Sequence, residues 1–305
     1  MLTTFLARSE VVRHARALHL LRELREALVA QARLSSSTFV AQASGPHGPT
    51  AFRHATLASI PAFSLTVRPS LRADARSTGA LLHLYDAPSG RLLASMDAGH
   101  LGTLSQAVVG ALAADALARP DAATVAVLGC GPPASSALKA LRLVRSLERV
   151  ALYDPDLVSS TTQALALHQS LSMPVRACES AEEAVSRADL IVLTGQVTLP
   201  TDAIRNGAHV TVMAAEQFDD APVPGSLLTR ARVFSETREP SRPWAPLGVT
   251  ALADVLDGRL PARGTPSDVT VFLATTPPVI DLVAGWHVYE GARHDERLTR
   301  VDLDA

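Results

Sequence analysis

The spacing of hydrophobic positions changes along the chain, and each change predicts a different kind of structure. In residues 10–33, apolar residues recur at steps of three and four, which indicates an amphipathic helix with an arginine- and glutamate-rich outer face. From about residue 38 to 94 the spacing shortens toward two, with glycine and proline turn signals between the runs. This pattern predicts an antiparallel sheet. Residues 107–117 are alanine-rich and apolar nearly all round, which predicts a buried helix.

After Pro120, apolar strand patterns alternate with helical patterns, which is typical of a parallel sheet with crossover helices. Residues 125–128 form a continuous apolar run, as expected for a central strand buried on both faces. A final helix over residues 282–289 is expected to return to the first part of the chain. The remaining strands are predicted at 150–153, 190–194, 209–213, 232–235 and 269–273, and the helices at about 138–144 and 180–188.

These patterns predict an α/β fold: a Rossmann-type, doubly wound parallel sheet, plus an α+β antiparallel-sheet domain formed by both chain ends. We place the second of these in residues 1–106 with 278–305, and the Rossmann domain in residues 107–277. The apolar content of 47% is sufficient for two hydrophobic cores in a chain of 305 residues.

Charge and cysteine content narrow the class of partner. Lys and Arg total 28 and Asp and Glu total 30, spread along the chain, so no basic field predicts binding to nucleic acid or an anionic membrane. A small-molecule substrate is expected instead. The N-terminus lacks the pattern of a signal peptide, which predicts a cytoplasmic protein. The isolated Cys130 and Cys178, and the absence of a paired-histidine motif, predict neither a disulfide nor a metal site.

The strongest motif is Gly129-x-Gly131-x-x-Ala134, which follows a buried strand directly and opens a helix. Gly129 permits a tight turn, Gly131 lets a pyrophosphate approach the backbone, and Ala134 keeps the helix close to the strand. The pyrophosphate is expected to lie on the amide groups and positive end of that helix. The motif therefore predicts a dinucleotide-binding site.

Asp154 ends the second strand of this domain, at the distance expected for a carboxylate that accepts hydrogen bonds from the adenosine ribose. Asp156 follows, and no basic residue lies between them to pair with a 2′-phosphate. These residues favour NAD over NADP, with NADP still possible. Pro132, at the start of the helix, and Thr194, at the end of the strand over 190–194, complete the predicted cofactor site.

Several segments of the chain, together with the order of its elements, resemble one family. These segments are residues 84–94, 97–104, 127–131, 180–185 and 275–281. Through most of the chain they resemble the ornithine cyclodeaminase and mu-crystallin family, which also includes ketimine reductases and some alanine dehydrogenases. The resemblance implies a substrate site in the first domain, and a homodimer in which a two-fold partner covers an exposed sheet edge and apolar surface.

The chain departs from the family where relatives bind the carboxylate of an amino acid. An arginine of the family, near the start of the helix between the domains, is matched here by Ser105. A second arginine of the family falls near Ser37, and its lysine falls at Thr66. Without these cations, the carboxylate loses its charge-assisted partners. This departure argues against a standard ornithine cyclodeaminase.

Arg68 is one candidate to replace the missing cations, because a period of two places it on the same strand face as Thr66. The alternative is a solvent-facing arginine before Pro69. Arg53 and His54 are weaker candidates, and for both we favour a position on the surface.

Glu216 matches the acid that handles the substrate nitrogen in the family, and a carboxylate at the end of a strand suits proton transfer or stabilisation of a cation. A loop glutamate in water is the alternative, and Asp219 or Asp220 serves instead if the loop register differs. His83 and His100 are secondary candidates that face the expected cleft between the domains.

Three functions are compatible with these residues. The first is an NAD-dependent oxidoreductase acting at a carbon–nitrogen centre of a small biosynthetic substrate, which reduces an imine or oxidises an amine. The second is an amino-acid cyclodeaminase, which uses bound NAD without net redox change. The third is a protein of mu-crystallin type that binds the cofactor without catalysis.

Overall fold

A computed structural model describes residues 2–33, 36–45, 48–69, 79–213, 223–238 and 248–303. The chain divides into two compact units, and each is described by itself. Unit 1 comprises Met1–Ser105 and Pro277–Ala305, and unit 2 comprises Gln106–Thr276. Unit 1 carries a mixed sheet and unit 2 a parallel sheet, so the predicted α/β fold class is confirmed.

The sheet of unit 1 has seven strands, in the order β15-β1-β6-β5-β4-β3-β2. Strands β2 to β6 pair with their neighbours in antiparallel fashion, as the period of two predicted. Strand β1, which was not predicted, pairs with β6 in parallel and makes the sheet mixed. The bounds are β1 (Thr3–Leu6), β2 (Ser36–Gly45), β3 (Gly48–Leu57), β4 (Ala62–Pro69), β5 (Leu81–Asp86), β6 (Leu92–Asp97) and β15 (Thr299–Val301).

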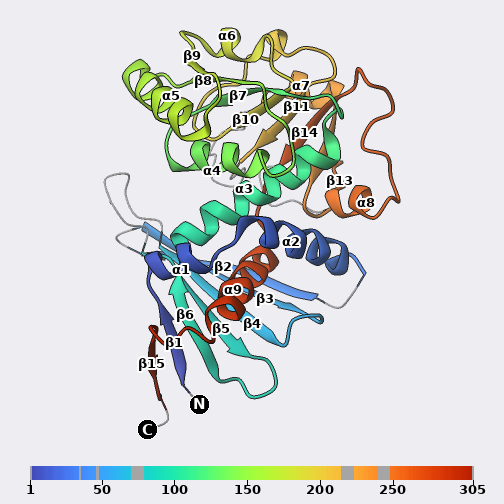
Figure 1. Cartoon of the computed structure of the whole chain (residues 1–305). Coiled ribbons are helices and arrows are strands. Elements are labelled where there is room, and N and C mark those ends of the chain that lie inside the picture. The colour runs from blue at the N-terminus through green and yellow to red at the C-terminus, as the bar shows by residue number, and fades with distance from the viewer. Residues whose placement is uncertain are drawn as a thin grey trace. The chain divides into compact units, whose positions relative to one another are not determined.

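One face of this sheet is covered by the helix α9 (Pro278–Ala292), which contacts β3, β4 and β5 (Figure 1). The side chains of Ala62, Ser64 and Thr66 alternate along β4 and are buried toward this helix. Leu82 on β5 lies against Gly285 of α9, where an added Cβ would be 2.7 Å from Leu82 Cδ2. Helix α9, from the last part of the chain, therefore completes the core of unit 1.

The single helix predicted over residues 10–33 is wrong, because the structure has two helices there, α1 (Arg8–His14) and α2 (Ala17–Gln31). The backbone is extended at Ala15 and Arg16, and the Arg16 N–H donates to His287 Nε2 on α9 at 3.0 Å. His287 Nδ1 lies 3.0 Å from Glu23 on α2. The break thus allows both helices to contact α9.

The alanine-rich helix is longer than predicted: α3 spans Ala98–Leu117 rather than beginning at residue 107. Its start is fixed by Asp97, whose Oδ1 accepts a hydrogen bond from the His100 N–H at 3.0 Å. The two glycines of the first turns weaken the helical pattern in the sequence, since glycine has low helix propensity.

The sheet of unit 2 has eight strands in the order β13-β12-β14-β11-β10-β7-β8-β9, and all of its recorded pairings are parallel. Because β7 pairs with both β8 and β10, the winding direction reverses at β7, the position where open α/β sheets bind ligands. The bounds are β7 (Thr124–Leu128), β8 (Arg149–Tyr153), β9 (Val175–Ala177), β10 (Leu190–Leu193), β11 (His209–Val212), β12 (Ala231–Ser235), β13 (Thr250–Ala251) and β14 (Val269–Leu273).

Short helices flank this sheet, and one longer helix, α5, was not predicted. Its inward positions Ala164, Leu167 and Leu171 have helical spacing, but exposed Leu157 and Leu165 obscure the pattern in the sequence. The helices are α4 (Pro132–Leu141), α5 (Leu157–Leu171), α6 (Ala181–Val185), α7 (Gly225–Arg230) and α8 (Leu252–Leu256), with the 3-10 helix η1 (Thr201–Ala203). No helix in the described residues has the length and hydropathy needed to cross a membrane.

Candidate functional site

The glycine loop joins β7 to α4, as the motif predicted. Gly129 and Gly131 have φ of +106° and +101°, which L side chains rarely adopt. A Cβ at Gly129 would lie 2.5 Å from the backbone nitrogen of Gly195, whereas at Gly131 its nearest neighbour would be Pro133 Cδ at 3.8 Å. Gly129 is therefore required for packing within the protein, while Gly131 leaves open space.

Asp154 follows β8 and is held against the glycine loop. Its Oδ2 accepts from the Cys130 N–H at 2.9 Å, and its Oδ1 accepts from the Asp156 N–H at 3.0 Å. Burial and the neighbouring Asp154 raise the pKa of the Cys130 thiol to about 11, so this thiol stays protonated at neutral pH. Asp156 accepts from the Val158 N–H and caps α5.

Thr194 and Ala134 shape the loop from its two sides. The Thr194 hydroxyl, at the end of β10, lies 3.1 Å from the Gly129 carbonyl oxygen and 3.3 Å from that of Leu128, and donates to them. Ala134 is completely buried, which lets α4 pack closely on the sheet. The contacts of both residues are with the protein itself, so their predicted role toward the cofactor stays a prediction.

The start of α4 differs from the expectation for the pyrophosphate. Pro132 and Pro133 occupy its first two positions, and proline has no N–H to donate. The Gly131 N–H is also occupied, because it donates to Gln163 Oε1 of α5 at 2.6 Å. Positions 131–133 therefore offer no free N–H group to the pyrophosphate, contrary to the expectation for these positions of the helix start. The open space at Gly131 and the fixed Asp154 carboxylate still fit a dinucleotide.

In unit 1, three charged side chains lie between the sheet and α9. Asp281 Oδ2 accepts from Arg53 Nε of β3 at 2.8 Å, and Asp281 Oδ1 accepts from Arg68 Nη2 of β4 at 2.9 Å. Burial alone would raise the pKa of Asp281, but the two guanidiniums outweigh burial and hold it below its ordinary value. The surface position favoured for Arg53 is wrong, because Arg53 is 9% exposed.

Arg68 does not simply face solvent, since 27% of its side chain is exposed and its guanidinium packs against α3. A Cβ at Gly102 would lie 2.9 Å from both terminal nitrogens of Arg68, so this contact requires glycine. Ser105, one turn later, donates to the carbonyl oxygens of Leu101 and Gly102 within its own helix. Arg68 thus lies near the start of α3, in the first turns of the helix.

Two buried hydroxyls lie beside this charged group. Thr66 pairs across the strands with Arg53, and Ser64 lies two residues earlier on the same face. Neither hydroxyl has a hydrogen-bond partner among the described residues. Buried polar groups are normally paired, so such hydroxyls are candidates to contact a ligand or a water molecule.

The remaining predicted residues separate into two groups. Glu216, Asp219 and Asp220 lie outside the described residues. His83 and His100 are partly buried in unit 1, and burial lowers the pKa of both, which favours neutral imidazoles. His54 lies within the sheet: its Nδ1 is 3.0 Å from the Ser64 carbonyl oxygen.

Three residues with long-range contacts were not identified from the sequence: Gln163 and Asp281, which contact candidate site residues, and Glu236. Glu236 is buried after β12 and accepts from the N–H groups of Thr275 and Thr276, at the end of unit 2. A buried acid or amide far from its partner in sequence has no periodic signal. Of the three, Asp281 was the easiest to infer from the sequence, because a carboxylate one turn into an apolar helix is unusual.

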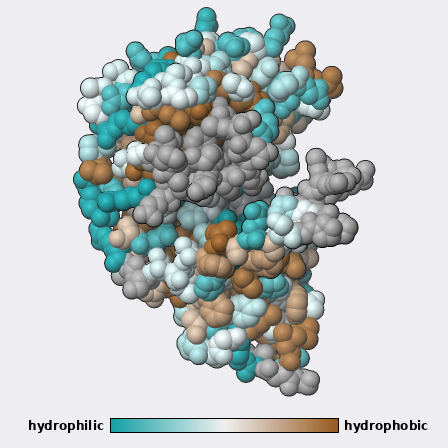
Figure 2. Space-filling model, turned by 180° about the vertical axis from the view of Figure 1, so that it is seen from behind, coloured by the Kyte–Doolittle hydropathy of each residue, from teal (hydrophilic) through white to brown (hydrophobic). Residues whose placement is uncertain are grey.

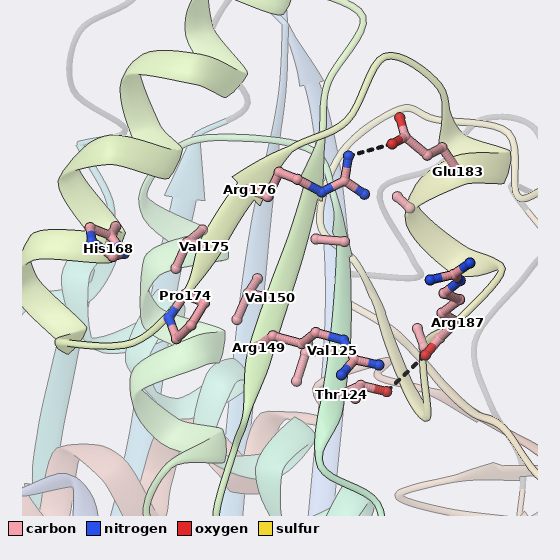
Figure 3. Close-up of a pocket in the computed structure, with 13 residues that line it drawn as sticks. Thr124, Val125, Arg149, Val150, His168, Pro174, Val175, Arg176, Glu183 and Arg187 are labelled. Atoms are coloured by element: carbon pink, nitrogen blue, oxygen red, sulfur yellow. Dashed lines mark hydrogen bonds and ion pairs between the residues drawn. The ribbon is translucent and has the colours of Figure 1, made fainter.

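A separate cavity of about 430 Å³ lies in unit 2 at the beginnings of β7 and β8, whereas Gly129 and Asp154 follow the ends of these strands (Figure 3). Arg149, Arg176 and Arg187 line this cavity, and Arg176 pairs with Glu183. Arg149 and Arg187 therefore lie at the edge of the sheet opposite Asp154. No cluster of metal-ligating side chains occurs within the described ranges.

The profile of the ornithine cyclodeaminase/mu-crystallin family matches residues 66–296, more than half of the chain. The chain belongs to this family. The ketimine reductase mu-crystallin of Rattus norvegicus is 27% identical over 94% of this chain and 96% of its own length. The predicted family is thus confirmed, and the predicted activity at carbon–nitrogen bonds is that of its relatives.

Two solved structures of the same fold cover nearly the whole chain. The Δ1-pyrroline-2-carboxylate reductase of Thermococcus litoralis, in complex with NADH and L-proline, has a TM-score of 0.90 and 18% identity, covering 98% of this chain and all of its own. An archaeal alanine dehydrogenase dimer with bound NAD has a TM-score of 0.91 and 22% identity, covering 99% of this chain and 100% of its own. Both relatives contain the predicted cofactor.

Proposed function

We propose that this member of the family is an NAD-dependent oxidoreductase that reduces an imine of a small substrate, or oxidises the corresponding amine. The observation that carries the proposal is the glycine loop at the reversal point of the parallel sheet, with Asp154 fixed beside it. The relatives support the reaction class, because one is a ketimine reductase and another is a pyrroline-carboxylate reductase.

Within this proposal, unit 2 holds the cofactor through Gly129, Gly131, Ala134 and Asp154. NADH supplies a hydride when bound. Glu216 supplies the proton to the substrate nitrogen or stabilises its positive charge, as a carboxylate near the end of a strand is suited to do.

Arg68 anchors an anionic group of the substrate. Its Nη2 donates to Asp281 Oδ1, whereas its buried Nε has no hydrogen-bond partner among the described residues and is a donor for that anion. The unpaired Thr66 hydroxyl, across from Arg53, supplies a neutral donor. This arrangement favours a substrate with a carboxylate or an equivalent anion.

The proposal is tested by offering purified protein a panel of cyclic imines, exocyclic imines and diamino acids with NADH or NAD. NADH consumption that depends on an imine supports the proposed reaction. Ammonia release with unchanged NAD indicates a cyclodeaminase instead, and cofactor binding without any turnover indicates a non-catalytic member of the family.

NAD is expected to bind more tightly than NADP, because Asp154 and the capping Asp156 place negative charge where NADP carries its 2′-phosphate. Competitive titration of NADH with NADPH measures the preference. Asp154→Asn is expected to reduce it, while Arg149→Ala, at the opposite edge of the sheet, leaves it unchanged. Tighter binding of NADPH to the unmodified protein would contradict this assignment.

A homodimer is the second expectation, and the sheet of unit 1 offers the surface. Its face away from α9 exposes Phe39 on β2, Phe52 on β3 and Leu81 on β5, at 59%, 36% and 44%. In Figure 2 hydrophobic side chains gather over this unit. The alanine dehydrogenase of the same fold is a dimer. Exposed apolar patches of this kind commonly lie at interfaces between subunits.

Light scattering is expected to give twice the 32.1 kDa mass of one chain. Phe39→Glu combined with Phe52→Glu is expected to shift the mass toward a monomer, because two carboxylates in an apolar interface are costly to desolvate. Leu165→Glu on α5, equally exposed in unit 2, is the matched control and is expected to leave the mass unchanged. A monomeric mass for the unmodified protein would exclude the dimer.

A further inference from the structure

The glycine loop offers few backbone donors to an anion. The Cys130 N–H donates to Asp154 at 2.9 Å, and the Gly131 N–H donates to Gln163 at 2.6 Å. Pro132 and Pro133 follow, and neither has an N–H. Four successive positions, 130–133, therefore have no N–H that is available to a pyrophosphate.

The next residues of α4 offer few further N–H donors to an anion. The Ser135 N–H donates to the Gly131 carbonyl oxygen at 3.3 Å, as the first bond of the helix. Within the described loop, this leaves the Ala134 N–H as the one backbone donor at the helix start without a partner. The positive end of α4 persists, since aligned peptide dipoles do not depend on the first two N–H groups alone.

Gln163 fixes this arrangement from α5. Its Oε1 accepts from the Gly131 N–H, and its Nε2 donates to the Gly131 carbonyl oxygen at 2.9 Å and to Ser135 Oγ at 3.0 Å. One side-chain amide thus satisfies both backbone groups of the second glycine. The Gly131 N–H is released to a ligand only if these bonds break, which adds a cost to binding.

The adenosine end of the site, in contrast, keeps its hydrogen-bonding group available to the cofactor. Asp154 keeps its carboxylate at the end of β8, fixed by two backbone N–H groups, with lone pairs left for ribose hydroxyls. The affinity of the loop for a dinucleotide therefore depends on the ribose contact more than on the pyrophosphate contact.

From this donor count, we infer that Pro132 and Pro133 weaken the pyrophosphate subsite, so that NAD is an exchanging co-substrate of this chain and not a permanently retained group. The inference rests on the proposed function and deepens it. An oxidoreductase must release the spent cofactor in each cycle, whereas a cyclodeaminase returns the hydride to the same molecule. A weak pyrophosphate contact is suited to the first.

The test compares the unmodified protein with Pro132→Ala/Pro133→Ala, using calorimetric titration with adenosine, ADP-ribose and NADH. The variant regains two N–H groups at the positive end of a helix, and hydrogen bonds to charged groups are the stronger ones. Its affinity for ADP-ribose and NADH is expected to rise by roughly tenfold or more. Its affinity for adenosine, which lacks phosphate, is the internal control and is expected to stay constant.

The amount of NAD that stays bound during gel filtration is the second measurement. The unmodified protein is expected to lose NAD completely during gel filtration, and the variant to retain more of it. Unchanged NADH affinity in the folded variant, or NAD that stays bound to the unmodified protein in equal molar amount, would overturn the inference while leaving the proposed function intact. If neither protein binds NADH, the proposed function fails together with the inference.

Discussion

Glu216→Gln is expected to lower the turnover number by about two to four orders of magnitude, the usual range for a lost general acid or base. The amide has nearly the same shape as the carboxylate and lacks its titrating proton, so NADH affinity is expected to remain unchanged. Steady-state kinetics on the imine found in the panel measures turnover, and calorimetry measures NADH affinity. Unchanged kinetics would remove Glu216 from the proton-transfer role.

The neighbouring acids are the matched controls for this experiment. Asp219→Asn and Asp220→Asn are expected to change turnover little if Glu216 is the acid. A large loss in one of them, with Glu216→Gln unaffected, would assign the role to that residue. Arg68→Ala separates binding from chemistry: because an anchor acts before and during the reaction alike, it mainly raises KM.

The sequence predicted the fold of unit 2 well because its strands are buried on both faces. Each of the central strands β7, β10, β11 and β14 is a short, wholly buried and mostly apolar run, and such runs alternate with helices. In unit 1, the short strands β1 and β15 are too brief to show a period of two. The parallel pairing of β1 with β6 joins residues far apart in the chain, so local patterning contains no signal for it.

The candidate site divides in the same way. The glycine loop and Asp154 were predictable because their spacing is local and their roles are set by backbone geometry. The pairing of Arg53 with Asp281 spans 228 residues, and that of Gly131 with Gln163 spans 32. These contacts depend on tertiary structure. Pro132 and Pro133 are visible in the sequence. Their effect on the pyrophosphate becomes evident only in the structure, where the Gly131 N–H also has a partner.

The two glycines of the loop allow folding and cofactor binding to be tested separately. Gly129→Ala is expected to reduce stability strongly, because its Cβ would lie 2.5 Å from the backbone of Gly195. Gly131→Arg has no such conflict, since a Cβ there would be 3.8 Å from its nearest neighbour. Its remaining cost is the backbone conformation of Gly131, φ +101° and ψ −168°, a region essentially restricted to glycine, at about 1–3 kcal/mol for a residue with a side chain.

Gly131→Arg is therefore expected to yield folded protein in which NADH binding falls at least about a hundredfold, because the side chain fills the space above the loop that the pyrophosphate needs. Gly258→Arg is the matched control: Gly258 also has a positive φ, of +73°, and open surroundings, but it follows α8. It is expected to show a loss in Tm with unchanged NADH affinity. Equal NADH affinity in Gly131→Arg and Gly258→Arg would mean that the open space at Gly131 is not where the dinucleotide lies, since both variants place an arginine at a glycine of positive φ with open surroundings.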